Sequence, residues 1–374
     1  MTNGRTGWVG RERGVLVVGG RVAGPSLIAA VIAVICVAAG LQAAPGKASA
    51  NVVPGYAVID LTPIPEDGNV FGQALGVNGK RLVVGAVTNL EGNLEAVAWR
   101  SGQLEMLGTL GGTTSSAHAV NHDGAVVGES QIRDDAAVRA FVTRGDAMVD
   151  LGTLGGASSW GRDIDDRGTA VGGAELAGGA VHAFAWSGTG LEDLGTLGGS
   201  SSFAEAIGAK GEIVGSAALD GDVSSHAVVW DGPHVVDLGT LGGTFSAALD
   251  VSGRGDVVGW AELADRSAHA FRWRDGFLED LGTLGGGFSS ANGINRNGDV
   301  VGVSTLVGDV ESRGFVVLDD RMVALDELLP AGSGWSVTEA FAIDNVGRIA
   351  AQATFAGQTH AVLLVPEYGR ARTG

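Results

Sequence analysis

Leu-Gly-Thr-Leu-Gly-Gly, at residues 107–112, is the stretch that decides the fold, because it returns at a fixed interval. Its intact copies begin at Leu107, Leu151, Leu194, Leu238 and Leu281, in steps of 44, 43, 44 and 43 residues. Degenerate copies at Leu61 and Leu325 extend the series by 46 and 44 residues. A fixed period between 20 and 50 residues is typical of repeat architectures. The sequence therefore predicts seven repeated units.

Each repeat contains four short runs that favour β-strands, which we call a, b, c and d. Examples are residues 116–121, 126–128, 182–186 and 190–194. The runs are separated by turns rich in Asn, Asp and Gly, which supply the left-handed backbone that tight hairpins need. No window shows the period of a helix, so the pattern predicts an all-β fold.

The size and number of the repeats predict a seven-bladed β-propeller. Four antiparallel strands in about 44 residues is the size of one blade, and propellers usually have four to eight blades. The chain ends are complementary: residues 56–61 form a d strand without its a, b and c, and residues 341–364 provide a, b and c without a d. Pairing them would close the ring and remove two exposed edges. The alternatives are a β-solenoid or two stacked sandwiches.

The N-terminus has the pattern of a secretory signal. Arginines precede an uncharged apolar run of fifteen residues, 27–41, and small residues end at Ala50. We expect residues 1–50 to be a signal peptide, 51–366 the propeller and 367–374 a disordered tail, with an uncleaved anchor as the alternative. Cys36 is the single cysteine, so cleavage would leave a chain without disulfides, thiol catalysis or Cys-bound zinc. This predicts an extracellular or cell-surface protein.

Composition and charge narrow the classes of partner. The 374 residues include 64 Gly and 45% apolar residues, which excludes a disordered chain, and the glycines lack the period of collagen. The first 50 residues hold five basic and one acidic residue, which leaves 19 basic and 41 acidic residues, a net charge of −22, in residues 51–374. This charge argues against nucleic acid or anionic lipid as a partner. We expect a monomer that does not insert into a membrane after signal cleavage.

The order of the motifs carries a resemblance to a known family. Leu-Gly-Thr-Leu-Gly-Gly, Ile-Asn-x-x-Gly-x-Val-Val-Gly and His-Ala-Phe-x-Trp follow one another in a way that is similar to the bacterial extracellular HAF repeat family. The resemblance covers nearly all of residues 56–365, although the tripeptide is intact only at His182 and His269. It implies an exported or surface protein and transfers no activity residue by residue.

Repeated polar residues are candidates for metal ligands, but their spacing favours structural roles. The aligned histidines are His182, His226, His269 and His360. In a ring, equivalent positions of different blades lie too far apart to share one ion at bonds of about 2 Å, so we expect each histidine to be hydrogen-bonded at the start of strand c. The acids that precede the hexapeptide are Asp60, Asp150, Asp193, Asp237 and Asp280. We expect them to accept backbone donors in the crossing to the next blade. No cofactor is predicted, with calcium left open as an alternative.

Variation between repeats points to a ligand-binding face formed by the d-to-a crossings and the b-to-c loops. Aromatic residues interrupt a position rich in Ser and Thr, and a second aligned site lies two residues before the Val or Ile of strand a. The candidate ligand-binding residues are Trp160, Phe203, Phe245 and Phe288 at the first site and His118, Arg162, Glu205 and Asn292 at the second. Together they could bind sugar rings or a peptide, and packing of the aromatics between blades is the alternative.

We therefore expect a secreted, non-enzymatic module that binds an extracellular glycan or protein. The sequence lacks a Walker motif, a Gly-x-Ser-x-Gly elbow and a His-Glu-x-x-His pair. A secreted hydrolase or lyase is the alternative, and it would gather acids with raised pKa values at the central mouth of the propeller. A structural surface protein is a further alternative.

Overall fold

The computed structural model describes residues 55–62, 71–232 and 234–367. The predicted signal peptide, and the predicted tail apart from Glu367, lie outside these residues. These described residues all belong to one compact unit. Its described part consists of β-strands with two short 3-10 helices, η1 (Arg133–Asp135) and η2 (Leu325–Leu328), which confirms the all-β prediction.

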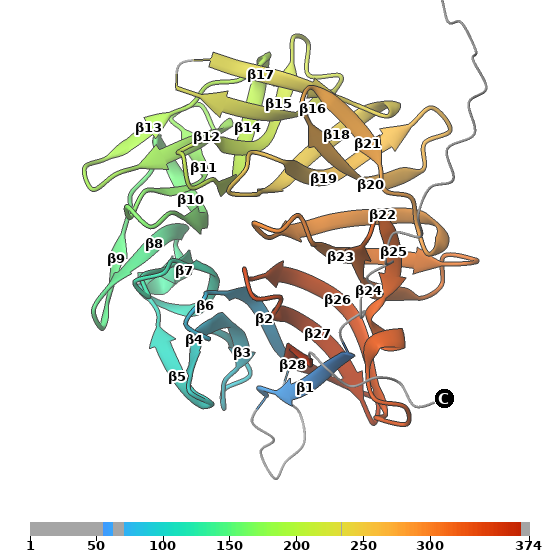
Figure 1. The fold of residues 1–374 in the computed structure, drawn as a ribbon. Helices are drawn as coiled ribbons and strands as arrows, with labels where there is room; N and C mark the ends of the chain where they lie inside the picture. The colour runs from blue at the N-terminus through green and yellow to red at the C-terminus, as the bar shows by residue number, and fades with distance from the viewer. Residues whose placement is uncertain (1–54, 63–70, 233, 368–374) are drawn as a thin grey trace, which may run out of the picture. The chain divides into compact units, whose positions relative to one another are not determined.

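The strands pair in antiparallel groups of four, which we number along the chain (Figure 1). Group 1 has β2 (Gly72–Val77), β3 (Val83–Thr88), β4 (Leu94–Arg100) and β5 (Gln103–Gly108). Group 2 has β6 (Gly111–Val120), β7 (Val126–Ile132), β8 (Val138–Arg144) and β9 (Ala147–Asp150). Group 3 has β10 (Gly155–Ile164), β11 (Ala170–Leu176), β12 (Val181–Trp186) and β13 (Leu191–Asp193).

The next three groups are joined in one sheet of twelve strands. Group 4 has β14 (Gly198–Ile207), β15 (Ile213–Leu219), β16 (Ser225–Asp231) and β17 (His234–Gly239). Group 5 has β18 (Gly242–Val251), β19 (Val257–Leu263), β20 (Ala268–Arg274) and β21 (Phe277–Asp280). Group 6 has β22 (Gly285–Ile294), β23 (Val300–Leu306), β24 (Ser312–Leu318) and β25 (Arg321–Ala324). The joins are the single parallel pairs Ser225 with Phe245 and Ala268 with Phe288.

Group 7 combines the two ends of the described chain. It has β26 (Trp335–Ile343), β27 (Ile349–Phe355), β28 (Gln358–Glu367) and β1 (Gly55–Asp60). β1 pairs antiparallel with β28 from Gly55 opposite Glu367 to Asp60 opposite Val362. The first strand of the described chain is thus the fourth strand of the last group.

Neighbouring groups pack through their first strands, which lie innermost in Figure 1. β6, β10, β14, β18, β22 and β26 each contact the first strand of the preceding group. β2 in turn contacts β26, β27 and β28. Each group therefore contacts a neighbouring group on both sides, and group 7 and group 1 contact each other.

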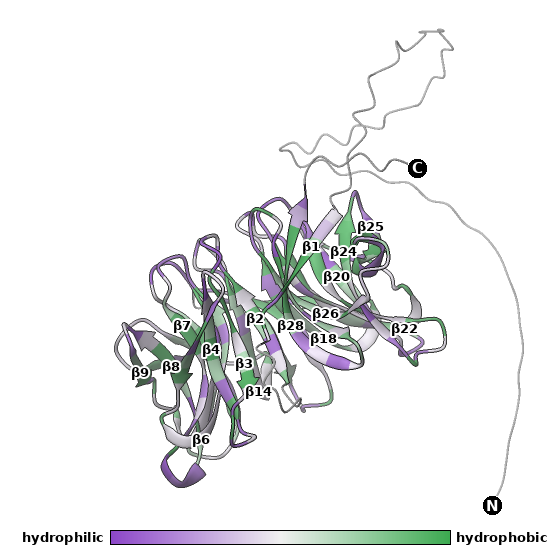
Figure 2. Cartoon of the chain, turned by 90° about the horizontal axis from the view of Figure 1, so that it is seen from below, coloured by the Kyte–Doolittle hydropathy of each residue, from purple (hydrophilic) through white to green (hydrophobic). Residues whose placement is uncertain are grey.

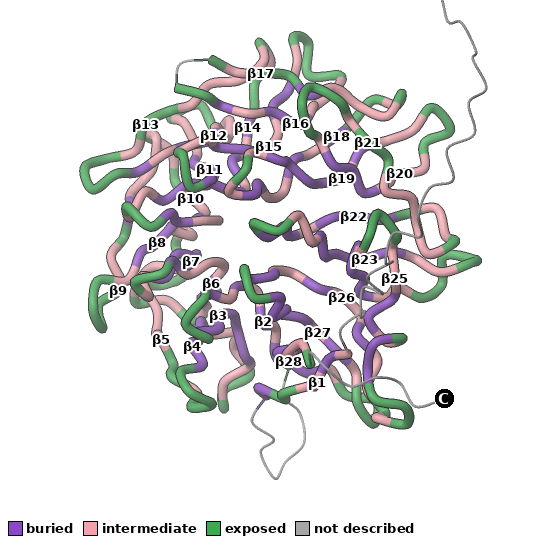
Figure 3. Tube along the Cα trace, viewed as in Figure 1, coloured by how far each residue is buried: buried purple, intermediate pink, exposed green. Residues whose placement is uncertain are grey.

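The hydrophobic core lies between neighbouring groups rather than in one central mass. Phe141, Phe184, Phe271 and Phe315, in the third strands, are fully buried. Ala74 and Val83 of group 1 share a cluster with Ala350 and Leu363 of group 7. Hydrophobic residues follow the strands in Figure 2, and buried residues follow the middle strands in Figure 3, with exposed residues at the loops. The third strands are apolar on both faces because each lies between two neighbouring sheets.

A serine in five of the seven inner strands ties one group to the preceding one. The Ser202 hydroxyl donates to the Gly195 carbonyl at 2.7 Å and accepts the Ala183 N–H of β12 at 2.9 Å. Equivalent bridges are made by Ser115, Ser159, Ser246 and Ser289. The glycine carbonyl belongs to the repeated hexapeptide, so the serine fixes the crossing between groups through one part-buried and one buried hydrogen bond.

The repeated histidine and aspartate bind each other. Nδ1 of His182 lies 2.9 Å from the Asp193 carboxylate, whose Oδ1 also accepts the Gly195 N–H at 2.8 Å. The same pair recurs in His226 with Asp237, His269 with Asp280 and His360 with Asp60. Both residues have the structural roles predicted for them, and their mutual pairing is an addition. The pair of His360 and Asp60 joins the two ends of the described chain.

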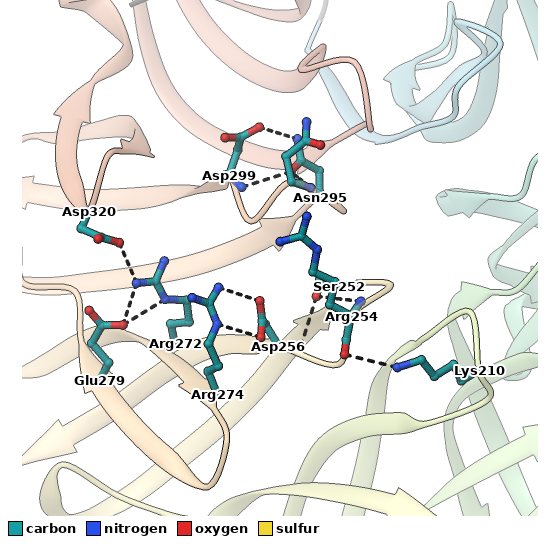
Figure 4. Close-up of polar contacts among 11 residues, drawn as sticks. Lys210, Ser252, Arg254, Asp256, Arg272, Arg274, Glu279, Asn295, Asp299 and Asp320 are labelled. Carbon is teal, nitrogen blue, oxygen red and sulfur yellow. Dashed lines mark hydrogen bonds and ion pairs between the residues drawn. The ribbon is translucent and has the colours of Figure 1, made fainter. Parts of the chain in front are cut away.

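Charged side chains also bridge neighbouring groups (Figure 4). The buried Arg272 guanidinium of group 5 lies 2.7 Å from Glu279 and 2.8 Å from Asp320 of group 6. Nζ of Lys210 donates to the Arg254 carbonyl across groups 4 and 5. Across groups 7 and 1, Arg348 Nη2 donates to the Gly79 carbonyl at 2.9 Å.

Candidate functional site

The aligned residues of three neighbouring inner strands meet. Nη1 of Arg162 in β10 lies 3.1 Å from Nε2 of His118 in β6. Nε of the same arginine lies 3.6 Å from the Glu205 carboxylate in β14. The three side chains are 21% to 29% exposed, so they are half-buried and still reach solvent. We call them, with Glu129 described next, the Arg162 cluster.

Glu129 of β7 completes the Arg162 cluster and was not predicted. Its carboxylate lies 3.5 Å from Arg162 Nη1 and 3.6 Å from His118 Nε2. The signal in the sequence was its position: Glu129 directly follows Val-Val-Gly, where the other repeats have uncharged residues. Val-Val-Gly indicates a structural motif of strand b, so the sequence alone does not single out Glu129.

The two carboxylates of the Arg162 cluster have pKa values shifted in opposite directions. Burial opposes ionisation of Glu129, but the hydrogen bond and charge of His118 and the charge of Arg162 lower its pKa overall. Burial raises the pKa of Glu205, and the charge of Arg162 offsets only part of that effect. Arg162 thus lies between one readily ionised acid and one that is reluctant to ionise.

Two of the predicted aromatic residues flank this cluster. The Arg162 guanidinium carbon lies 5.2 Å from the centroid of the Phe203 ring, a cation–π contact. The Trp160 and Phe203 rings are 6.5 Å apart and tilted by 41°. Gly173 makes room for the Phe203 ring, because a Cβ at that glycine would lie 2.2 Å from it. The structure thus brings together five of the eight predicted residues.

Phe245 and Phe288 do not belong to this cluster, which corrects the sequence alignment. Trp160 and Phe203 follow the repeated serine, whereas Phe245 and Phe288 precede it. With the serines aligned, the two pairs are offset by two residues, which is about 7 Å along the strand. Phe245 and Phe288 are each 40% exposed and lie where neighbouring groups join.

Asn292 takes part in a different polar contact. Its Nδ2 donates to the Glu339 carboxylate and to the Ala340 carbonyl of β26, both at 3.1 Å. Its Oδ1 accepts the Ser290 hydroxyl. Burial raises the pKa of Glu339, and the hydrogen bond from Asn292 offsets part of the rise. The predicted alignment of Asn292 with Arg162 is right, but the two side chains have different partners.

A pocket of about 760 Å³ lies in group 1 and reaches the start of β6. Its lining combines apolar side chains with amides, hydroxyls and two carboxylates. The lining residues are Val87, Thr88, Asn89, Leu90, Glu91, Asn93, Glu95, Leu104, Met106, Gly108, Thr109, Gly112 and Thr113. We call it the group 1 pocket. The b-to-c loop at residues 89–93 and the d-to-a crossing up to Thr113 belong to the variable face predicted from the sequence, but a pocket between them was not predicted.

The described residues contain neither a metal-ligand cluster nor a helix that could span a membrane. There, no group of three or more His, Cys, Asp or Glu side chains is arranged to hold a metal ion. Calcium at the acidic turns therefore stays an untested alternative. Nor does the described part of the chain contain a helix long and apolar enough to cross a membrane.

Comparisons with known proteins identify the fold. No protein-family model and no curated protein matches the sequence. The β-propeller domain of the trilobed protease from Pyrococcus furiosus, described as having an open velcro topology, aligns with 80% of this chain and 94% of its own, at 9% identity and a TM-score of 0.55. TolB from Acinetobacter baumannii aligns with 82% of this chain and 66% of its own, at 13% identity and a TM-score of 0.42.

A puromycin-hydrolyzing peptidase from Mycobacterium tuberculosis aligns with 82% of this chain and 54% of its own, at 12% identity and a TM-score of 0.45. This chain thus spans about half of the peptidase and about two thirds of TolB, and neither similarity is strong enough to carry an argument. The similarity to the trilobed protease domain is stronger and shows the fold alone. The chain is a β-propeller, as the repeats predicted.

Proposed function

We propose that this β-propeller is an exported, non-enzymatic module that binds an extracellular macromolecule, a glycan or a protein, through the face around the Arg162 cluster. The observation that carries the proposal is the meeting of His118, Arg162 and Glu205 from three separate groups beside the Trp160 and Phe203 rings. The repeats supply these different residues at one aligned position, so the scaffold repeats while this position varies.

The chemistry of the cluster suits recognition. Binding sites combine aromatic surface with a few polar groups that fix orientation. Arg162 offers N–H donors, Glu129 and Glu205 offer acceptors, and Phe203 holds the guanidinium by its ring face. Partial exposure lets these groups exchange their present contacts for contacts with a ligand.

A secreted hydrolase or lyase is the second candidate, and one observation favours it. Opposite pKa shifts on two nearby carboxyl groups, here Glu129 and Glu205, are a pattern of acid and base catalysis. Against it, Arg162 lies between the two carboxylates and within 3.6 Å of both. An arginine in this place interacts with both carboxylates. It also fills the space between them in which the bond of a substrate would have to lie, which favours binding over catalysis.

Export is part of the same proposal. The sequence supports it through the arginines that precede the apolar run at 27–41, the small residues up to Ala50 and the lack of cysteine beyond that point. The resemblance to the extracellular HAF repeats agrees with it. We propose a monomer at the cell surface or outside the cell.

We also propose that the propeller has seven blades and that β1 closes the ring. Support comes from the seven groups of four strands, from the pairing of β1 with β28 and from the contacts of β2 with group 7. A closed ring has no exposed sheet edge between its ends. It would also hold His118, Arg162 and Glu205 at fixed positions around one centre.

The test is binding by the full chain and by Arg162→Gln on arrays of glycans and of extracellular proteins. Arg167→Gln is the matched control, because Arg167 is an exposed arginine in the turn directly after β10. We expect a set of array ligands that bind the wild type and the control but lose about tenfold or more in affinity with Arg162→Gln. Equal binding by both variants would refute the proposed face. Glycan cleavage by the wild type that Glu205→Gln abolishes would favour the second candidate.

A further inference from the structure

The group 1 pocket lies where the repeat loses its histidine and aspartate pair. In group 3 the histidine directly precedes Ala183 and the aspartate is paired with Phe184. In group 1 the residue before Ala96 is Glu95, and the residue paired with Val97 is Met106. Glu95 and Met106 therefore occupy the positions of the imidazole and the carboxylate, and both line the pocket.

This exchange changes the chemistry of the position. In the other groups a histidine, or an arginine in groups 2 and 6 (Arg139 and Arg313), lies close to an aspartate, so a nitrogen donor and an acid satisfy each other. In group 1 the acid lies on β4, and the thioether of Met106 opposite offers it no donor. Glu95 accepts a hydrogen bond from Nδ2 of Asn89 at 3.1 Å. A neutral amide replaces the basic partner that the repeat supplies elsewhere.

The rest of the lining fits a long side chain with a basic end. Leu104 and Met106 supply apolar surface beside Glu95, and Leu90, 95% exposed, lies at the lining of the same pocket with Glu91. Lysine and arginine bury their methylene stems against apolar surface while their heads stay with acids or water. The two carboxylates and the apolar wall thus match both parts of such a side chain.

We propose that the group 1 pocket binds a basic side chain, lysine or arginine, of a peptide segment from a partner protein. The basic head meets Glu95, the stem lies on Met106 and Leu104, and flanking peptide residues fill the remaining volume. A pocket of about 760 Å³ is within the range of ligand sites and larger than one side chain needs. The net charge of −22 in residues 51–374 attracts basic partners.

This site is separate from the Arg162 cluster and does not depend on the proposed function. The group 1 pocket is formed by β3, β4, β5 and the start of β6, whereas Arg162 and Glu205 belong to β10 and β14. Arg162→Gln should therefore leave the group 1 pocket unchanged, and failure of either proposal leaves the other standing.

The experiment measures fluorescence anisotropy of a labelled peptide, Gly-Leu-Arg-Leu-Gly, with the full-length protein. Matched peptides carry lysine or the uncharged analogue citrulline in place of arginine. We expect the arginine and lysine peptides to bind, and citrulline to weaken binding about tenfold or more because it lacks the charge that meets Glu95. Glu95→Gln should weaken the arginine peptide by a similar factor.

Two further variants make the test specific. Glu105→Gln removes an exposed acid next to Met106 that bonds Arg100 and does not line the pocket, so binding should change less than about twofold. Glu95→His combined with Met106→Asp rebuilds the pair of the other repeats and should abolish binding while the melting temperature holds or rises. The proposal fails if the arginine peptide does not bind at millimolar concentration. It also fails if citrulline binds as well as arginine, or if Glu105→Gln weakens binding as much as Glu95→Gln does.

Discussion

Two carboxyl groups, those of Asp163 and Asp250, link inner strands of neighbouring groups. Oδ1 of Asp250 accepts the N–H of Val251, and Oδ2 accepts the N–H of Ile294 in β22, both at 2.7 Å. Asp163 makes the same pair of bonds with Ile164 and Ile207. Burial raises the pKa of Asp250 to about 7, and the nearby charge of Asp163 adds to the rise against the effect of the two backbone donors. Asp250 therefore binds a proton in the folded state at mildly acidic pH.

This predicts that stability depends on pH through Asp250. The unfolded residue has its ordinary pKa near 4, whereas the folded residue releases its proton near pH 7. Between these values the folded state binds more protons, so the free energy of unfolding falls as pH rises from about 4 to about 7 and is flat above. Urea unfolding of the wild type and Asp250→Asn at pH 4.5, 5.5, 6.5 and 7.5 measures the dependence.

Asp250→Asn removes the titrating group and leaves an amide whose Nδ2 can accept neither N–H. Its free energy of unfolding should fall less steeply with pH than that of the wild type. Asp220→Asn, at an exposed position in group 4, is the control and should keep the wild-type slope. The same slope in Asp250→Asn would show that Asp250 does not titrate in this range.

At the scale of the element, the glycine of the Val-Val-Gly motif in strand b is explained by the close approach of the strand b backbone to that of strand a. A Cβ at Gly215 of β15 would lie 2.0 Å from the Phe203 carbonyl oxygen of β14. The equivalent glycines meet the same obstacle at 1.9 to 2.0 Å: Gly85, Gly128, Gly172, Gly259 and Gly302. The strand register shifts at this point, between Ala204 and Ala206. The glycine therefore permits a bulge that re-aims the inner strand.

Gly215→Ala should destabilise the protein by about 1–3 kcal/mol or more, since backbone atoms must move to admit the methyl group. Gly79→Ala is the matched control, because no atom lies within 4 Å of its Cβ position. Chemical denaturation of both variants measures the difference. Group 7 carries Ala351 at the equivalent position, where β26 has an additional register shift between Val337 and Glu339. Equal stability of the two variants would contradict the close approach.

The elements also show what could be predicted from the sequence. Repetition located the strands and the alternation of turns, because each motif occurs several times. It also placed His118, Arg162 and Glu205 at one aligned position. It did not distinguish Phe245 from Phe203, because the surrounding segment is rich in hydroxyl residues and hides an offset of two residues relative to the repeated serine.

Contacts between strands account for the other differences. The sequence predicted structural roles for His182 and Asp193, but a pair eleven residues apart is visible only once β12 and β13 are paired. Glu129 was missed because its partners come from other strands. The sequence did not predict the group 1 pocket, because the pocket is formed by residues that depart from the repeat. The roles of Glu95 and Met106 can be inferred only once their neighbours across the sheet are known.

On the scale of the whole molecule, the two ends of the described chain meet in group 7. The Trp99 indole donates to the Leu61 carbonyl at 2.7 Å, and the Ala361 N–H donates to the Thr62 hydroxyl at 2.7 Å. The trilobed protease domain is described as having an open velcro topology. In this chain β1 pairs with β28, and the proposed closed ring depends on that pairing.

The most direct test of the account is thermal unfolding of the full chain after residues 55–60 are replaced by a Gly-Ser stretch of the same length. Replacement of residues 44–49 in the same way is the control. We expect the melting temperature to fall by about 10 °C or more with the first replacement and to hold with the second, because β1 supplies the fourth strand of group 7 and the Asp60 partner of His360. Equal melting of the two variants would show that β1 does not hold the ends together, and would contradict the closed seven-bladed ring.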